Sequence, residues 1–357
     1  MNRFAFIIHP LDCSDVARKF HFARYMPDAL LERTLKILPP VKISPITGIQ
    51  SPSAATEGFF VSCLLTARQM MSLPTPFVLN KIIQTARLAE KLGAQVVGLG
   101  AFTKVIGDAG ITIAKNLNIP VTTGNSYTVA TTLEGAKKAA ILMGHDLKKA
   151  RIVVVGATGS IGSVCALSLA RDVNHLTLIG RNEAKLHVLA DRILFETGLA
   201  ANVTSNIKSI LRTADLVITV TSSADAIIEP EDLKAGAVIC DVARPRDVSR
   251  RVVEKRDDVL VIEGGLVEVP GDVNFNFNFG FPPRTAYACM AETMILALEG
   301  RLESYTLGRD LTLKQVEEMH KLGRKHGFKL AGWRSFEKPV TEEEIHRIRQ
   351  KAMIKVS

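Results

Sequence analysis

The chain has 357 residues, of which 47% are hydrophobic and 23% are charged. This length suits two or three domains, and the hydrophobic share is enough to give each domain a core. The formal net charge of +9 is compatible with an acidic substrate or partner, but an ordinary basic surface is slightly favoured because no dense Lys/Arg block occurs. Aromatic residues make up only 6% of the chain and the basic residues form no dense block, which argues against a nucleic-acid-binding protein.

Neither a membrane span nor a secretory signal is predicted. No stretch approaches the about 20 consecutive apolar residues that a span requires, and the short apolar stretch near the N-terminus is broken by His9 and Pro10. The five cysteines are odd in number and none are spaced as C-x-x-C, so neither a disulfide framework nor a metal site is expected. These features predict a cytoplasmic protein with reduced thiols.

The first part of the chain alternates predicted strands and helices. The expected elements are a strand at Phe4–Ile8, a loop or hairpin over Pro39–Pro52, a helix at Asn80–Leu92, a strand at Gln95–Leu99 and a helix at Tyr127–Met143. Residues 1–144 are therefore predicted to form an N-terminal α/β domain that binds the substrate.

The middle of the chain has the clearest pattern. Strands are predicted at Arg151–Val155, Leu176–Ile179, Leu216–Val220, Ala237–Cys240 and Val259–Ile262, with helices at Ile161–Arg171 and Glu183–Glu196. The strands are apolar throughout rather than at alternate positions, which predicts a parallel sheet covered on both faces. Residues 145–281 are therefore expected to form an inserted Rossmann domain.

Helices dominate the last part of the chain. One is expected at Arg284–Glu299, directly after the pair Pro282-Pro283, a second at Leu313–His326, and a third after the capping-box pattern Thr341-Glu342-Glu343-Glu344. Residues 282–357 are predicted to be a helical tail that packs on the N-terminal domain. The fold class is thus α/β, and ligands are expected in a cleft at the carboxyl ends of the Rossmann strands.

A glycine pattern lies directly between the first strand and the first helix of the Rossmann region. The segment Gly156-Ala157-Thr158-Gly159-Ser160-Ile161-Gly162 follows G-x-x-G-x-x-G. Gly156 allows a tight turn, Gly159 lets the backbone approach a pyrophosphate, and Gly162 allows close packing of helix on strand. All seven residues are candidate ligands of a dinucleotide.

The end of the second Rossmann strand indicates which dinucleotide binds. An NAD-binding domain usually has an acidic residue there, whereas this strand is followed by Arg181, which favours the 2′-phosphate of NADPH. Lys185 is placed to assist; the alternative is that Arg181 is an ordinary surface residue. Thr221 and Ser222 are expected beside the nicotinamide ribose, unless they only form a serine-rich turn.

Cys289 has the most distinctive setting of the five cysteines. It falls in the second turn of the helix expected after the prolines, where the helix dipole lowers a thiol pKa only weakly, and Glu292 follows one turn later on the same face. Cys63 is the second candidate nucleophile. The alternative for any of them is a buried small hydrophobic residue.

Several motifs together resemble those of the cyanobacterial long-chain acyl-ACP reductases, which make fatty aldehydes. The matching segments are Gly98–Thr103, Thr122–Thr128, Val155–Gly162, Gly264–Glu268, Tyr287–Met294, Gly308-Arg309 and His326–Phe328, within residues 1–330. The resemblance implies that Cys289 carries the acyl group and that the cofactor is NADPH. The segment Asp241–Val248 is more similar to the corresponding turn of glutamyl-tRNA reductases, which share this domain plan with shikimate dehydrogenases.

The expected reaction is reduction of a long-chain fatty acyl thioester, on acyl carrier protein or coenzyme A, to an aldehyde that a partner enzyme would consume. Thr103, Asn125 and Ser126 are candidates for stabilising the oxyanion, or alternatively they stabilise loops. The candidates for an apolar acyl channel are Phe59, Phe60, Leu64, Leu65, Phe102 and the segment Phe275–Phe281.

Two other functions fit the same sequence. One is a dehydrogenase of the shikimate or quinate type without a covalent cysteine, in which Lys104 and Asp108 would supply the polar pair of the cleft. The other is a non-catalytic, NADPH-binding regulatory protein. Turnover of NADPH with acyl-CoA, with shikimate or with no added substrate separates the three.

Overall fold

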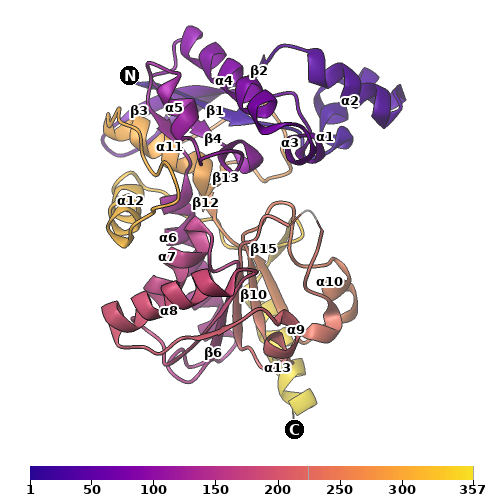
Figure 1. The fold of residues 1–357 in the computed structure, drawn as a ribbon, viewed down its shortest axis with the longest axis vertical. Helices are drawn as coiled ribbons and strands as arrows, with labels where there is room; N and C mark the ends of the chain where they lie inside the picture. The colour runs from indigo at the N-terminus through magenta and orange to yellow at the C-terminus, as the bar shows by residue number, and fades with distance from the viewer. Residues whose placement is uncertain (224, 357) are drawn as a thin grey trace. The chain divides into compact units, whose positions relative to one another are not determined.

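The chain forms two compact units, shown in the computed structural model of Figure 1, which describes residues 1–223 and 225–356. Unit 1 consists of residues 1–127, 267–311 and 318–329, and unit 2 of residues 128–266, 312–317 and 330 onward. The predicted domain limits, residues 1–144, 145–281 and 282–357, stay a prediction. The two units themselves change over at Tyr127/Thr128 and at Leu266/Val267.

Unit 1 is built on a five-stranded sheet. Its order is β2 (Val41–Gln50), β3 (Ala55–Ser62), β1 (Arg3–Ile8), β4 (Val96–Leu99) and β5 (Val121–Thr122). The strands are parallel except for β2, which pairs antiparallel with β3. The proline-rich segment expected as a loop or hairpin is therefore the first arm of a hairpin.

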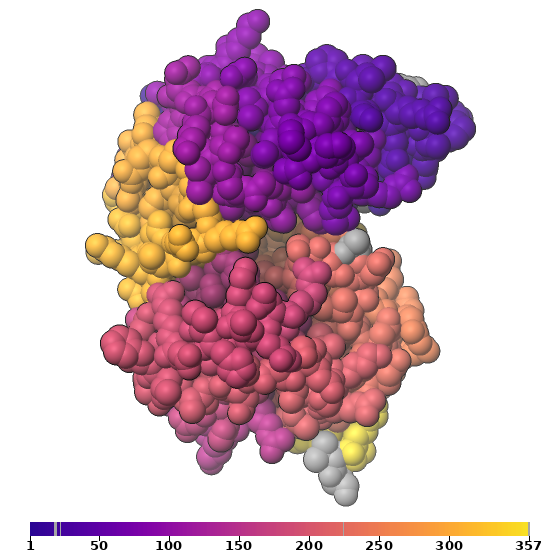
Figure 2. Space-filling model, in the orientation of Figure 1, coloured from indigo at the N-terminus to yellow at the C-terminus, as the bar shows by residue number. Residues whose placement is uncertain are grey.

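Two helices pack on this sheet. Alternate residues of a strand face opposite sides: Val97 and Leu99 belong to the core that includes α4 (Thr75–Lys91), whereas Gly98 faces Thr293 of α11 (Ala288–Glu299). In Figure 2 the orange segment that contains α11 lies against the flank of the purple N-terminal segment of unit 1. The remaining helices of this unit are α1 (Cys13–Lys19), η1 (His21–Tyr25), α2 (Asp28–Ile37), α3 (Ala67–Ser72), η2 (Ala101–Lys104) and α5 (Ile111–Lys115).

Helix α11 begins four residues later than the prolines predict. Thr285–Tyr287 forms strand β13, which pairs with β12 (Leu266–Glu268), itself paired with β14 (Lys329–Leu330). Pairing with β12 holds Thr285–Tyr287 extended, so the helix starts at Ala288. It ends as predicted at Glu299, with Gly300 as its left-handed C-cap.

Unit 2 contains a six-stranded parallel sheet. Its order is β11 (Leu260–Glu263), β10 (Val238–Asp241), β9 (Leu216–Thr219), β6 (Arg151–Val155), β7 (His175–Ile179) and β8 (Asn202–Thr204). The order reverses between β6 and β9, which is the Rossmann arrangement. The predicted α/β class and the Rossmann domain are both confirmed.

Helices surround this sheet in Figure 1. They are α6 (Asn125–Leu142), α7 (Ser160–Leu169), α8 (Glu183–Thr197), α9 (Ile207–Leu211), η3 (Pro230–Asp232) and α10 (Arg251–Lys255). Helix α12 (Leu313–Lys325) follows α11 and contributes residues to both units. No helix in the described ranges is both long and apolar enough to cross a bilayer.

The end of the chain differs from the helical tail expected on the N-terminal domain. Residues from Leu330 onward belong to unit 2 and include a hairpin, β15 (Trp333–Ser335) with β16 (Lys338–Val340), before α13 (Glu342–Val356). Two lysines of α13, Lys351 and Lys355, pair with Asp257 of the Rossmann unit. The capping box at Thr341 and Glu344 is confirmed by reciprocal hydrogen bonds of 3.0 and 3.3 Å.

Candidate functional site

The glycine loop connects β6 to α7 at the carboxyl edge of the Rossmann sheet. Gly156 has a φ of +80°, and a Cβ there would lie 2.7 Å from the carbonyl oxygen of Val220. A Cβ on Gly162 would lie 2.3 Å from the carbonyl oxygen of Gly156, whereas the nearest atom to one on Gly159 is 3.4 Å away. Protein atoms therefore leave no room for a side chain at Gly156 or Gly162, whereas there is space next to Gly159. A loop that receives a pyrophosphate requires this arrangement.

The residues expected at the 2′-phosphate lie beside this loop. A Cβ on Gly180 would lie 3.4 Å from the side chain of Thr158, and Arg181 follows directly. Arg181 and Lys185 are both exposed, and no carboxylate of residues 1–223 or 225–356 forms an ion pair with either. Their charges are thus available to a phosphate. Their contact with a cofactor stays a prediction.

Asp247 holds the turn expected near the nicotinamide ribose. This fully buried carboxylate accepts hydrogen bonds from the Thr219 hydroxyl at 2.6 Å, the Thr221 amide at 2.9 Å and the Thr221 hydroxyl at 2.5 Å. The Thr221 hydroxyl is therefore engaged within the protein, whereas Ser222 is exposed. Sequence reasoning did not single out Asp247, because no local pattern links it to Thr221.

A second buried acid, Asp241, shapes the segment that resembles glutamyl-tRNA reductases. It accepts the amide hydrogens of Ala243 and Val248, both at 3.0 Å. Burial raises the pKa of Asp241 to about 7 against the opposing charge of Arg244. The Asp241 carboxylate thus stabilises the Asp241–Val248 turn by binding two of its backbone amides.

Cys289 is the second residue of α11. The sequence places it in the second turn, and this is corrected: in the first turn the helix dipole supports a thiolate more strongly. The preceding loop packs directly on it, since a Cβ on Gly124, whose φ is +72°, would lie 2.3 Å from the Cα of Cys289. Only glycine fits this position without displacing the cysteine.

The other thiols have less favourable surroundings. Burial raises the pKa of Cys63 and of Cys165 to about 12, and raises that of Cys240 further. Cys13 is half-buried like Cys289, but burial and nearby carboxylates raise its pKa to about 11. At Cys289 burial also raises the pKa, with Lys104 opposing the rise and Glu292 adding to it.

Glu292 organises the segments around Cys289. It is fully buried, and its carboxylate accepts hydrogen bonds from the hydroxyls of Thr122 at 2.5 Å, Ser126 at 2.6 Å and Thr306 at 2.9 Å, and from the Tyr127 amide at 2.9 Å. One carboxylate thereby ties α11 to the end of β5 and the start of α6, which carry Gly124 between them.

The three candidate oxyanion residues have different partners. The buried Thr103 hydroxyl donates to the Gly100 carbonyl at 2.6 Å, and the Ser126 hydroxyl donates to Glu292. The Asn125 side-chain oxygen accepts a hydrogen bond from the ammonium of Lys104 at 2.8 Å. Of the three, Asn125 is thus linked to a cation near Cys289, whereas Ser126 is linked to the carboxylate of Glu292. A role in substrate binding stays a prediction for all three.

Lys104 and Asp108, considered above as a dehydrogenase-type pair, are engaged separately. Asp108 accepts from the Thr112 amide at 2.9 Å and from the Thr112 hydroxyl at 2.6 Å. Lys104 donates to Asn125 instead. These separate hydrogen bonds do not support the hypothesis that Lys104 and Asp108 form the polar pair of a shikimate-type dehydrogenase.

Aromatic rings form a continuous row in unit 1. In the Asn-Phe repeat Phe275 is buried, Phe277 and Phe279 are half-buried, and the three asparagines are exposed, as the alternation predicts. Phe60 of β3 contacts the rings of Phe275, Phe277 and Phe279; from Phe279 the row continues through Phe281 to Tyr287, with ring centroids 4.6–6.4 Å apart. The row ends two residues before Cys289.

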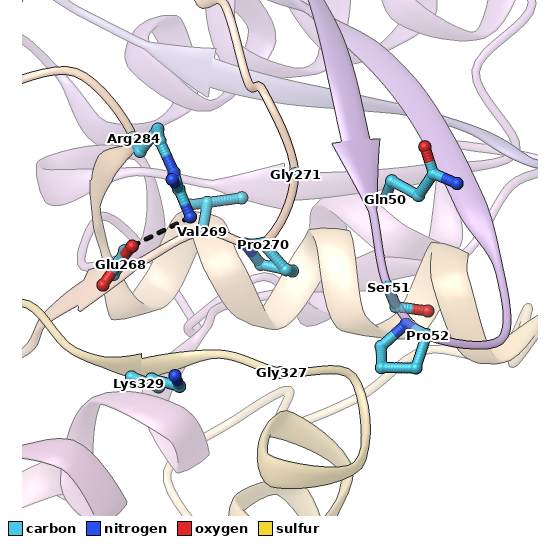
Figure 3. A pocket seen from close by; sticks show the side chains of 10 residues that line it. All are labelled: Gln50, Ser51, Pro52, Glu268, Val269, Pro270, Gly271, Arg284, Gly327 and Lys329. Carbon is cyan, nitrogen blue, oxygen red and sulfur yellow. Dashed lines mark ion pairs between the residues drawn. The ribbon is translucent and has the colours of Figure 1, made fainter.

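A separate cavity of about 390 Å³ opens in unit 1, lined by Gln50–Pro52, Glu268–Gly271, Arg284, Gly327 and Lys329 (Figure 3). Arg284 and Glu268 form a 2.9 Å ion pair on its wall. None of the candidate site residues lines it. Across the described ranges, no group of three or more His, Cys, Asp or Glu side chains could hold a metal ion.

Comparison with known proteins places these features in a family context. Residues 137–263 match the family model of shikimate / quinate 5-dehydrogenase. Over 88% of its length the chain is 27% identical to the long-chain acyl-[acyl-carrier-protein] reductase of Synechococcus elongatus, of which it covers 94%. The chain is homologous to this reductase.

Other relatives share parts of the same plan. The chain is 28% identical over 90% of its length to the aminotransferase PigE of a Serratia species, but it spans only 37% of PigE. Its 26% identity to the glutamyl-tRNA reductase of Cyanophora paradoxa covers 48% of the chain and 41% of that enzyme, so the expected relation is confirmed. Shikimate dehydrogenase (NADP(+)) of Methanosarcina mazei is 34% identical over 30% of the chain and 41% of its own length, and its name agrees with the expected NADPH. Three of these four relatives carry names of oxidoreductases.

Proposed function

We propose that this protein reduces long-chain fatty acyl thioesters to aldehydes with NADPH through an acyl-enzyme on Cys289. The observation that carries the proposal is the setting of this thiol. Cys289 is half-buried in the first turn of α11, packed against Gly124 and influenced by the charge of Lys104. These residues occur in a chain homologous to a long-chain acyl-ACP reductase.

Unit 2 is proposed to bind the NADPH. The loop Gly156–Gly162 has an open middle glycine for the pyrophosphate, and Arg181 and Lys185 offer unpaired charges for the 2′-phosphate. Thr221 and Ser222 lie on the turn held by Asp247. When bound, NADPH supplies the hydride.

The Cys289 thiolate is proposed to attack the thioester carbonyl. The new bond joins its sulfur to the acyl carbon, and the old carbon–sulfur bond breaks, releasing the carrier as its thiol after protonation. After reduction to the thiohemiacetal, the bond to Cys289 breaks and the aldehyde leaves. The thiol is thereby restored. Covalent capture divides one difficult displacement into two easier steps.

The aromatic row supports a long acyl chain as the substrate. Its rings run from Phe60 through the Phe275–Phe281 segment to Tyr287, which precedes Cys289 by two residues in the chain, so apolar side chains lead towards the nucleophile. The net charge of +9 supports an acidic acyl carrier protein as donor, with association weakened by salt. An aldehyde-consuming enzyme is the proposed downstream partner.

Acyl capture without NADPH tests the proposal. Incubation with palmitoyl-CoA is expected to add one palmitoyl mass to the peptide containing Cys289, and NADPH is then expected to release an aldehyde. Cys289→Ala should abolish both, whereas Cys63→Ala, which alters a buried thiol of the same unit, should retain both. Aldehyde formation by Cys289→Ala at the wild-type rate would refute the mechanism.

A further inference from the structure

Lys104 occupies a defined place near the proposed nucleophile. It is the last residue of η2, which follows β4 after Gly100, and its side chain is half-buried. Its ammonium donates to the Asn125 side-chain oxygen at 2.8 Å. Asn125 is the residue after Gly124, whose backbone packs directly on Cys289. Lys104 is thus held to the same loop that touches the cysteine.

The charge of Lys104 is not neutralised by its partner. Asn125 is a neutral amide, and among residues 1–223 and 225–356 no carboxylate forms an ion pair with this lysine. The two acids considered above with Lys104 and Cys289 accept hydrogen bonds from other groups, Asp108 from Thr112 and Glu292 from four donors. A half-buried cation without a counterion is expected to stabilise an anion formed close by.

Cys289 is the group near Lys104 that can become that anion. Burial and the carboxylate of Glu292 both raise its pKa, so both disfavour the thiolate. The position at the amino end of α11 favours the thiolate, and so does Lys104. Without the lysine, the buried thiol would face a carboxylate with only the backbone amides and the dipole at the amino end of α11 to offset it.

We propose that Lys104 is the electrostatic support of the Cys289 thiolate and that Asn125 positions its ammonium through a hydrogen bond. No proton is transferred in this role: Lys104 stays charged and acts through its field, so it is a positioning residue rather than a base. This proposal rests on the proposed function, because it assumes that Cys289 is the nucleophile. From the sequence alone, Lys104 was considered only together with Asp108, as the polar pair of a shikimate-type dehydrogenase.

The pH dependence of Cys289 alkylation tests this role directly. The purified chain is treated with iodoacetamide between pH 6 and 10, and the labelled peptide that contains Cys289 is quantified by mass spectrometry. Lys104→Met is expected to move the midpoint of the rate profile up by about one pH unit, which makes labelling about tenfold slower at pH 7.5. Lys104→Arg, which keeps the charge, should shift it much less.

Two further measurements make the result specific. Labelling of Cys13, a half-buried thiol next to Asp28 rather than Lys104, should be the same in all variants. Asn125→Asp, which gives the ammonium a carboxylate partner, should also raise the Cys289 midpoint while retaining the lysine. An unchanged Cys289 midpoint in both Lys104→Met and Asn125→Asp would overturn the proposal.

This readout separates the inference from the proposed function. A raised midpoint together with no acyl adduct from palmitoyl-CoA would support the role of Lys104 and contradict acyl-thioester chemistry. An acyl adduct with an unmoved midpoint would contradict the role of Lys104 and leave the acyl-enzyme supported. Thermal unfolding shows whether each variant is folded. If Lys104→Met does not fold, the Cys289 midpoint of Asn125→Asp is compared with that of Lys104→Arg instead.

Discussion

Arg181 is the residue proposed to select NADPH over NADH at the end of a strand. It follows β7 after Gly180, it is exposed, and the glycine loop lies beside Gly180. A charge-assisted hydrogen bond to a phosphate contributes on the order of 1.5–3 kcal/mol. Arg181→Gln is therefore expected to raise the KM for NADPH by about 10- to 100-fold and to leave the KM for NADH nearly unchanged, as measured by steady-state kinetics.

Arg192→Gln is the matched control for this prediction. Arg192 lies on the neighbouring helix α8 and forms an exposed ion pair with Glu196 at 2.7 Å, so its loss should leave both KM values unchanged. An equal change in the two KM values of Arg181→Gln would contradict recognition of the 2′-phosphate.

At the residue scale, the sequence could identify groups whose chemistry is local but not the groups that position them. Cys289 and the glycine loop each stand in a contiguous motif. Glu292 was placed on the helix face of Cys289, yet its donors Ser126 and Thr306 lie 166 and 14 residues away in the chain. The link from Lys104 to Asn125 spans 21 residues across a strand. Such contacts follow from tertiary packing and leave no periodic signal.

At the element scale, prediction succeeded where one local pattern decides the structure. Strand β6 was predicted with the bounds that it has, because five consecutive residues of strand type are followed at once by a glycine turn. The start of α11 was wrong because the proline pair is compatible with a helix start but cannot report that β12 pairs with the next residues. A distant strand therefore decided the position of Cys289 in its helix.

Gly98 is the element-scale contact that lets α11 lie on the sheet. A Cβ at this position of β4 would lie 2.0 Å from the Thr293 hydroxyl oxygen and 2.6 Å from the ring of Phe6. Gly98→Ala is therefore expected to push α11 from β4, to lower the free energy of unfolding by about 1–3 kcal/mol, and to slow acyl transfer to Cys289. Urea denaturation and the palmitoyl adduct assay measure the two effects.

Gly135→Ala provides the contrast for Gly98→Ala. Gly135 lies within helix α6, and no atom lies within 4 Å of the Cβ that it would acquire. Alanine stabilises a helix interior by up to about 1 kcal/mol relative to glycine, so this variant should be as stable as the wild type or more so. Equal loss of stability in the two variants would show that α11 does not depend on the close approach at Gly98.

At the scale of the whole molecule, each unit has its own core, and the chain enters each of them more than once. The sequence indicated an inserted Rossmann region from the alternation of strands and helices. It could not indicate where α13 packs, because an amphipathic helix shows that one face is buried but not which surface covers it. In the structure α13 buries Ile345 and Ala352, and the exposed ion pairs of Lys351 and Lys355 with Asp257 accompany that packing.

The two units contain buried titratable groups with opposite effects on stability. In unit 1, burial lowers the pKa of His9 to about 4, and the neutral ring fits its partners: Nδ1 donates to the Pro10 carbonyl and Nε2 accepts the Phe102 amide hydrogen. The unfolded chain takes up this proton near pH 6.5. Stability from His9 is therefore complete above pH 6.5 and is lost as the pH falls towards 4.

Asp241 in unit 2 acts in the other direction. Its folded-state pKa of about 7 lies above the ordinary aspartate value of 3.8, so the unfolded state releases the proton at a lower pH. The stability that Asp241 contributes is therefore lost as the pH rises from about 4 to 7. Between pH 7.5 and 5, the His9 effect is expected to destabilise unit 1 by about 2 kcal/mol and the Asp241 effect to stabilise unit 2 by a similar amount.

The single tryptophan makes this last prediction measurable. Trp333 belongs to unit 2, where its indole donates to the Gly135 carbonyl, so the urea dependence of its fluorescence reports the unfolding of that unit. Hydrogen exchange of β1 reports unit 1. Lowering the pH from 7.5 to 5 should raise the midpoint seen by Trp333 and weaken the protection of β1. Asp241→Asn should remove the pH dependence of the Trp333 midpoint and leave that of the β1 protection. His9→Asn should remove the pH dependence of the β1 protection and leave that of the Trp333 midpoint. Parallel trends in the two units of the wild type would contradict the assignment of these opposing proton equilibria to His9 and Asp241.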